Sequence, residues 1–119
     1  MTRVLVVEDD PGVALGLEDD LRVEGYEVEV GGDGESALSR ARERRFDLLI
    51  LDVMLPGRDG FEVCQTLRSE GVDSAIVMLT AKDTQEDKEL GLSLGADDYI
   101  TKPFSPAKLR ARIKTLLCR

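Results

Sequence analysis

Three short runs of consecutive apolar residues constrain the fold of this chain more than any other feature. They cover residues 4–7, 48–51 and 75–79. The runs are apolar throughout rather than alternating with polar residues, as expected of parallel strands that helices cover on both faces. Two weaker runs, residues 27–30 and 98–101, indicate shorter strands nearer the edges of the sheet. The pattern therefore predicts five parallel strands.

Amphipathic segments separate the strands and predict five helices, over residues 11–24, 34–44, 60–70, 84–94 and 105–117. Residues that can cap a helix N-terminus stand at the start of four of them, namely Asp10, Asp33, Thr84 and Ser105. Glycines follow three of them, at Gly25, Gly71 and Gly95. Short right-handed crossovers then give an α/β fold, a (βα)5 three-layer sandwich with helices on both faces of a five-stranded parallel sheet.

The size and charge of the chain narrow its function. Its 119 residues suit one domain with one core, and no linker-like stretch divides them. A formal net charge of −8 argues against direct binding of a nucleic acid by this domain and suits a protein partner or a cation. The sequence has no histidine, which excludes a histidine general base and a histidine metal cluster.

Cysteine usage and hydropathy bear on the compartment. Cys64 and Cys118 have no metal-ligand spacing, so they are expected to be two free thiols in a reducing environment. No signal peptide and no long apolar run is evident. The expectation is a cytoplasmic protein without a membrane segment.

Polar residues stand at the carboxyl ends of four predicted strands, and they are Glu8, Asp9, Asp10, Asp52, Thr80 and Lys102. In open parallel sheets such residues gather at one edge, near the switch in strand order. Carboxylates held a few ångströms apart repel one another, and a hard cation and an ammonium group would relieve that repulsion. Mg²⁺ prefers carboxylates and often shares its remaining positions with a phosphate. The edge is therefore expected to bind Mg²⁺ (or Mn²⁺), with room for a phosphoryl oxygen.

The same edge suits phosphoryl transfer. A carboxylate is a competent nucleophile, and an aspartyl phosphate is a known covalent product. In such reactions the protein mainly positions groups and neutralises charge on the equatorial oxygens, which a cation, Lys102 and Thr80 could each engage. Asp10 is the exception in this set, because its place before Pro11 favours a structural N-cap over a metal role.

Four sequence strings resemble those of response-regulator receiver domains of bacterial two-component systems, in the order and spacing of that family. They are VVEDD (6–10), LDVMLPGRDG (51–60), MLTAK (78–82) and GADDYITKPF (95–104). The resemblance covers essentially the whole chain and is greatest to receivers that precede a winged-helix DNA-binding domain, the OmpR/PhoB-like subfamily. It implies a receiver domain over residues 1–119 with the flavodoxin-like strand order 2-1-3-4-5. Any effector domain would lie outside this chain; the alternative is a stand-alone receiver.

The resemblance also implies a role for each site residue. Asp52 matches the phosphoacceptor, and Asp9 and Asp52 match the carboxylate metal ligands. The backbone carbonyl of Met54 matches a third ligand, and Glu8 matches an acidic residue that reaches the metal through water. The family catalyses only its own phosphorylation and slow dephosphorylation, so the chain is not expected to be an enzyme acting on other substrates.

Three further positions match the family's switching apparatus. Thr80 matches the hydroxyl that moves toward the phosphoryl group, and Lys102 matches the ammonium that pairs with it. Tyr99 matches the aromatic residue that turns inward when the threonine moves. The Lys102–Pro103 peptide bond is expected to be cis, as in other receivers.

Resemblance likewise implies two interaction surfaces. A histidine kinase would dock on the first helix, where Ala14, Leu15 and Leu17 are candidates. A homodimer would form through the face made by residues 84–94, 98–101 and 105–117, and the matching positions there are Lys88, Leu92, Asp97, Asp98, Ala111 and Arg112. Lys108 departs from the family, which usually has a glutamate there to pair with the basic residue at position 88. We expect a weaker dimer, because each exposed ion pair contributes only ~0–1 kcal/mol.

Three other functions compete with this interpretation. A flavin or nucleotide binder of the same fold would need a loop after the first strand that holds phosphate, whereas residues 8–11 are acidic and would repel it. A magnesium-dependent phosphohydrolase would usually carry a second aspartate at the position of Met54. A pseudo-receiver that binds partners without phosphorylation is disfavoured, because every active-site position holds a competent residue.

Overall fold

This computed structural model describes residues 1–118, in which five strands and five helices alternate along the chain. The strands are β1 (Arg3–Val7), β2 (Glu27–Gly31), β3 (Leu48–Leu51), β4 (Ala75–Thr80) and β5 (Asp98–Thr101). The helices are α1 (Pro11–Val23), α2 (Gly34–Glu43), α3 (Gly60–Ser69), α4 (Gln85–Ser93) and α5 (Pro106–Leu117). Every expected element is present, and the expected helix ranges differ mainly because they included the cap residues.

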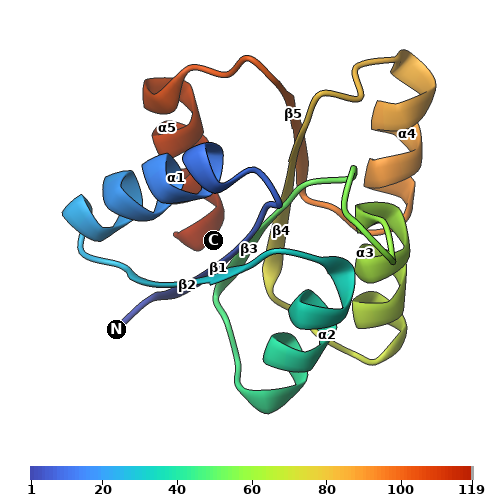
Figure 1. Ribbon diagram of the computed structural model, residues 1–119, viewed down its shortest axis with the longest axis horizontal. Helices are drawn as coiled ribbons and strands as arrows, with labels where there is room; N and C mark the ends of the chain where they lie inside the picture. The colour runs from blue at the N-terminus through green and yellow to red at the C-terminus, as the bar shows by residue number, and fades with distance from the viewer. Residues whose placement is uncertain (119) are drawn as a thin grey trace.

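The sheet is parallel throughout and has the order β2-β1-β3-β4-β5, which confirms the expected fold class and strand order. The two weaker strands, β2 and β5, lie at its edges as expected. Figure 1 shows α1 and α5 on one side of the sheet and α2, α3 and α4 on the other. These three layers are the expected sandwich.

Two apolar cores explain why the strand sequences are apolar throughout. In β3, Leu49 and Leu51 belong to the core under α2 and α3, whereas Leu48 and Ile50 belong to the core under α1 and α5. Successive side chains of a strand point to opposite faces, so a strand covered on both faces needs apolar residues at every position. All four of these residues are fully buried.

Helix caps form where the sequence predicted them. The Asp10 carboxylate accepts hydrogen bonds from the backbone N–H groups of Gly12 and Val13, at 2.9 and 3.3 Å, which confirms its structural role. The Thr84 hydroxyl accepts one from the N–H of Asp87 at 3.1 Å. No helix among residues 1–118 has the length and apolarity needed to cross a bilayer.

The two cysteines differ in exposure, and this predicts a simple labelling result. Cys64 is buried in α3, and burial raises the pKa of its thiol, whereas Cys118 is exposed. Because the thiolate is the reactive form, an aromatic disulfide reagent should react quickly with one thiol of the native protein and with the second only after denaturation. Cys118→Ser should remove the fast phase. Two fast-reacting thiols in the native protein would contradict the prediction.

Candidate functional site

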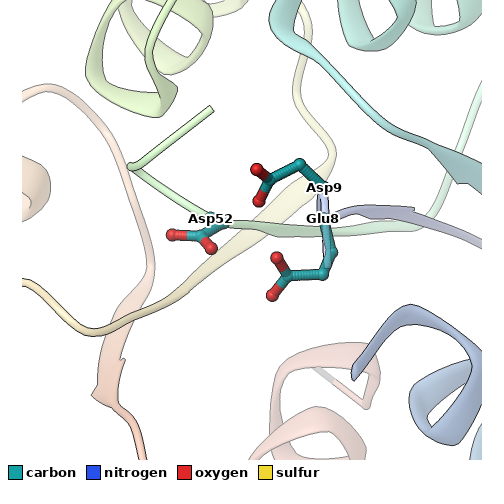
Figure 2. A group of neighbouring side chains, drawn as sticks. All are labelled: Glu8, Asp9 and Asp52. Carbon is teal, nitrogen blue, oxygen red and sulfur yellow. The ribbon is translucent and has the colours of Figure 1, made fainter. Parts of the chain in front are cut away.

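Neighbouring strands bring three carboxylates together at the carboxyl edge of the sheet. Strands β1 and β3 pair in parallel with Val7 opposite Leu51, so the residues that follow them emerge side by side. Glu8 and Asp9 follow β1, Asp52 follows β3, and each offers a ligand oxygen within 4.8 Å of those of the other two. Figure 2 shows these carboxylates directed into one shared space beyond the strand ends. The expected acidic cluster is therefore present.

Burial differs among the three carboxylates. Glu8 and Asp52 are only 4% and 5% exposed, whereas Asp9 lies at the surface. Loss of solvation raises the pKa of Glu8, and the neighbouring charge of Asp52 acts in the same direction. The N–H of Met54 donates to Asp52 Oδ1 at 3.0 Å, which holds the carboxylate in one orientation. Negative charge is thus concentrated where little water can screen it.

Lys102 supplies a positive charge to this cluster. Its Nζ donates to Asp52 Oδ2 at 3.0 Å and also pairs with Glu8. Burial acts to lower the pKa of Lys102, but its hydrogen bonds to Glu8 and Asp52 outweigh that effect and leave the pKa raised. The Lys102–Pro103 peptide bond is cis, as the resemblance implied. One ammonium group facing three carboxylates leaves a surplus of negative charge.

The donor set fits a small hard cation. Carboxylate oxygens are the ligands that Mg²⁺ prefers in proteins, and a site open on the side of an exposed carboxylate such as Asp9 leaves room for water and a phosphate. Among residues 1–118, Glu8, Asp9 and Asp52 are the only set of three or more acidic, cysteine or histidine side chains close enough together to hold one metal ion. The sequence had selected the same three side chains.

Thr80 and Tyr99 both contact the backbone of one residue, Lys82. Thr80 ends β4 and is fully buried, and its Oγ1 accepts the N–H of Lys82 at 3.3 Å. The Tyr99 hydroxyl donates to the carbonyl oxygen of Lys82 at 2.7 Å. Burial, with the carboxylate of Asp87 as the next cause, raises the pKa of Tyr99 to about 12. Sequence reasoning missed Lys82 because its contribution is a backbone group, although the string MLTAK contains it.

Three of the expected dimer-face charges, Asp97, Asp98 and Arg112, have partners within the chain. Asp98 pairs with Arg112 at 2.5 Å, and Asp97 accepts hydrogen bonds from Arg68 at 3.2 Å and from the N–H of Ile76 at 2.9 Å. The remaining positions are at least partly solvent-accessible, including Lys88, Leu92, Lys108 and Ala111. Lys108, Ala111 and Arg112 line a cavity of about 630 Å³ between β5 and α5.

The expected kinase-docking residues are only partly at the surface. Leu15 is 58% exposed, but Ala14 and Leu17 are 6% and 3% exposed. The prediction was therefore wrong for Ala14 and Leu17, because the face of α1 that contains them packs on the sheet together with Leu21.

The fold and the site define an α/β protein whose parallel sheet, in flavodoxin-like order, gathers carboxylates, a lysine and a threonine at its carboxyl edge. The response regulator receiver domain family matches residues 4–114. The chain belongs to this family. It is 50% identical over 117 residues to the alkaline phosphatase synthesis transcriptional regulatory protein PhoP of Bacillus subtilis (strain 168), covering 98% of this chain and 49% of that protein. The chain thus spans about half the length of this curated relative.

Solved structures agree with this assignment. The receiver domain of the Francisella response regulator 1452 superposes with a TM-score of 0.95 at 34% identity, over 100% of this chain and 98% of that one. The BeF3-activated N-terminal receiver domain of Klebsiella pneumoniae RstA superposes with a TM-score of 0.94 at 36% identity, over 99% and 100% of the two chains.

Proposed function

We propose that this domain accepts a phosphoryl group on Asp52 from a histidine kinase and passes the signal on through its α4-β5-α5 face. The observation that carries the proposal is the environment of Asp52. Its buried carboxylate is oriented by the Met54 N–H and by Lys102, and it lies beside Glu8 and Asp9. A nucleophile, its charge partners and a cation site therefore share one edge of the sheet.

A divalent cation, Mg²⁺ (or Mn²⁺), belongs to this proposal. Asp9 and Asp52 would hold it through their carboxylates, Met54 through its carbonyl oxygen, and Glu8 through water. When bound, it neutralises charge on the phosphoryl oxygens. The surplus of negative charge around Lys102 supports this assignment.

The proposed reaction is a displacement at phosphorus. An Asp52 carboxylate oxygen forms the new P–O bond while the P–N bond to the kinase histidine breaks, and the departing imidazole nitrogen keeps the electron pair and takes a proton from water. Lys102 and Thr80 hold phosphoryl oxygens. Slow attack of water on the product returns the Asp52 carboxylate and inorganic phosphate. The domain would catalyse only these two reactions of its own.

The proposed signal output begins with the negative charge that phosphorylation adds at Asp52. A phosphoryl group adds roughly −1.5 to −2 charges and three acceptor oxygens. Thr80 would follow those oxygens, Tyr99 would respond, and the α4-β5-α5 face would shift its population of states by the ~1–3 kcal/mol typical of such coupling. We propose that the α4-β5-α5 face controls transcription in the cytoplasm, through a DNA-binding domain outside these 119 residues. The name of the PhoP relative, a transcriptional regulatory protein, supports this proposal. A homodimer through this face would be weakened by Lys88 meeting Lys108.

The test is uptake of a phosphoryl group from acetyl phosphate with Mg²⁺, followed by intact mass and by elution volume. We expect a gain of one phosphoryl group, its loss in Asp52→Asn, and its loss when EDTA removes the cation. Asp59→Asn is the matched control, because Asp59 lies in the same β3–α3 connection, is exposed and caps α3 as asparagine also can. It should keep the mass gain. No gain under any condition would support the pseudo-receiver instead.

A further inference from the structure

Helix α4 meets the core through a residue that has no side chain. Gly91 is its one buried residue, while Leu90 and Leu92 on either side are 44% and 48% exposed. Figure 1 shows α4 standing beside β5 and α3 at one end of the molecule. What lies beneath Gly91 therefore determines how closely α4 can approach the sheet.

The ring of Tyr99 lies beneath Gly91. A Cβ atom at position 91 would stand 2.8 Å from Cδ2 and 3.0 Å from Cε2 of this ring, and 2.8 Å from Sδ of Met78. Carbon atoms in contact prefer about 3.5–4.0 Å, so even a methyl group cannot be accommodated without movement. Met78 is fully buried in β4 and has little room to give way. An added side chain must therefore move at least one of three groups: the Tyr99 ring, the Met78 side chain or α4.

The other end of the same ring is tied to the β4–α4 connection. The Tyr99 hydroxyl donates to the carbonyl oxygen of Lys82, and the N–H of Lys82 donates to Thr80 Oγ1. The ring is thus held at its tip by the segment that leads into α4 and along its edge by α4 itself. A change in the position of Tyr99 changes both supports of the helix.

We propose that Gly91 is a positioning residue, which allows the Tyr99 ring to lie inward beneath α4 and makes the positions of the ring and the helix depend on each other. The steric link is a property of the folded chain. It rests on the proposed function only in one respect, namely that phosphorylation of Asp52 would be the event that acts on Tyr99 through Thr80.

Tyrosine fluorescence reports on this link directly. The chain has no tryptophan and two tyrosines, so Tyr26→Phe leaves Tyr99 as the only source of tyrosine fluorescence. In this background, Gly91→Ala should make Tyr99 more accessible to quenching by acrylamide. The matched control is Gly16→Ala, also a glycine inside a helix, where an added Cβ meets nothing within 4 Å. It should leave the quenching of Tyr99 unchanged. Equal quenching in the two variants would overturn the proposal.

A double substitution keeps the proposal testable if Gly91→Ala folds poorly. Because the clash involves the ring, Tyr99→Ala should remove most of the loss in urea midpoint that Gly91→Ala causes. An equal loss with and without the ring would overturn the proposal, since Met78 or the helix alone would then account for it.

Acetyl phosphate with Mg²⁺ separates this inference from the proposed function. In the Tyr26→Phe background we expect a phosphoryl mass gain and a change in Tyr99 quenching, and in Gly91→Ala the same mass gain with a smaller change. No mass gain in any variant would count against the proposed function alone. A normal mass gain with an equal quenching change in both proteins would count against the role of Gly91 alone.

Discussion

An alanine at position 60 is expected to lower the free energy of unfolding by about 3 kcal/mol, at the upper end of what overpacking usually costs. Gly60 opens α3 and lies against the backbone that follows β3. A Cβ there would stand 2.2 Å from the carbonyl oxygen of Asp52 and 2.7 Å from Cα of Val53. Both are backbone atoms of the segment that carries Asp52, and the Gly60 N–H donates to the Val53 carbonyl at 2.8 Å. Relief of the clash must therefore move the backbone at Asp52, the start of α3, or both.

Urea unfolding followed by circular dichroism measures this effect. Gly16→Ala is again the control, because α1 has open space at that position, and it should stabilise the protein by about 0.5–1 kcal/mol. In Gly60→Ala a displaced Asp52, the proposed acceptor, should also take up phosphoryl groups more slowly. A Gly60→Ala protein as stable as the control would show that the β3–α3 connection yields more easily than its backbone contacts indicate.

Arg68→Ala should have an effect of similar size, about 3 kcal/mol, for an electrostatic reason. The guanidinium of Arg68 donates to the carbonyl oxygens of Val72, Ser74 and Gly95, at 2.8, 2.8 and 3.0 Å, and pairs with Asp97 at 3.2 Å. The two charged side chains are only 23% and 21% exposed. Removal of the guanidinium leaves three carbonyl groups without this donor and Asp97 without this cation.

A neighbouring arginine provides the control for this prediction. Arg42 forms two hydrogen bonds to Glu70, at 3.0 and 2.6 Å, but both side chains are more exposed, at 51% and 38%. Solvent screens such a pair, so Arg42→Ala should lower the free energy of unfolding much less than Arg68→Ala does. Both variants are compared by urea unfolding at one pH. Similar losses for Arg42→Ala and Arg68→Ala would mean that Arg68 does not hold the α3–β4 and α4–β5 connections together.

The acidic site could be predicted without coordinates because strand ends of a parallel sheet share an edge. Once residues 4–7 and 48–51 were recognised as strands, Glu8, Asp9 and Asp52 had to emerge near one another. The family resemblance then supplied the cis bond at Pro103, which residue chemistry alone does not reveal. The three carboxylates of the site could thus be identified from the local sequence alone, whereas the cis bond required the resemblance.

Contacts between segments far apart in the chain were harder to predict from the sequence. Asp97 was assigned to a dimer face, but its partner in the chain is Arg68, 29 residues earlier. Leu15 was grouped with Ala14 and Leu17, although only Leu15 points away from the sheet. In both cases the sequence shows which side chains are present but not which surface each one meets.

The sequence by itself determined the ten elements, the N-caps of four helices, the parallel sheet and the cluster at its edge. The spacing of apolar residues, the capping residues and the positions of strand ends are all local signals. Only the tertiary structure decided that Gly60 and Gly91 must lack side chains and that the backbone of Lys82 meets both Thr80 and Tyr99. These properties depend on the distance between segments that are far apart in the chain. Packing sets that distance, and no local pattern encodes it.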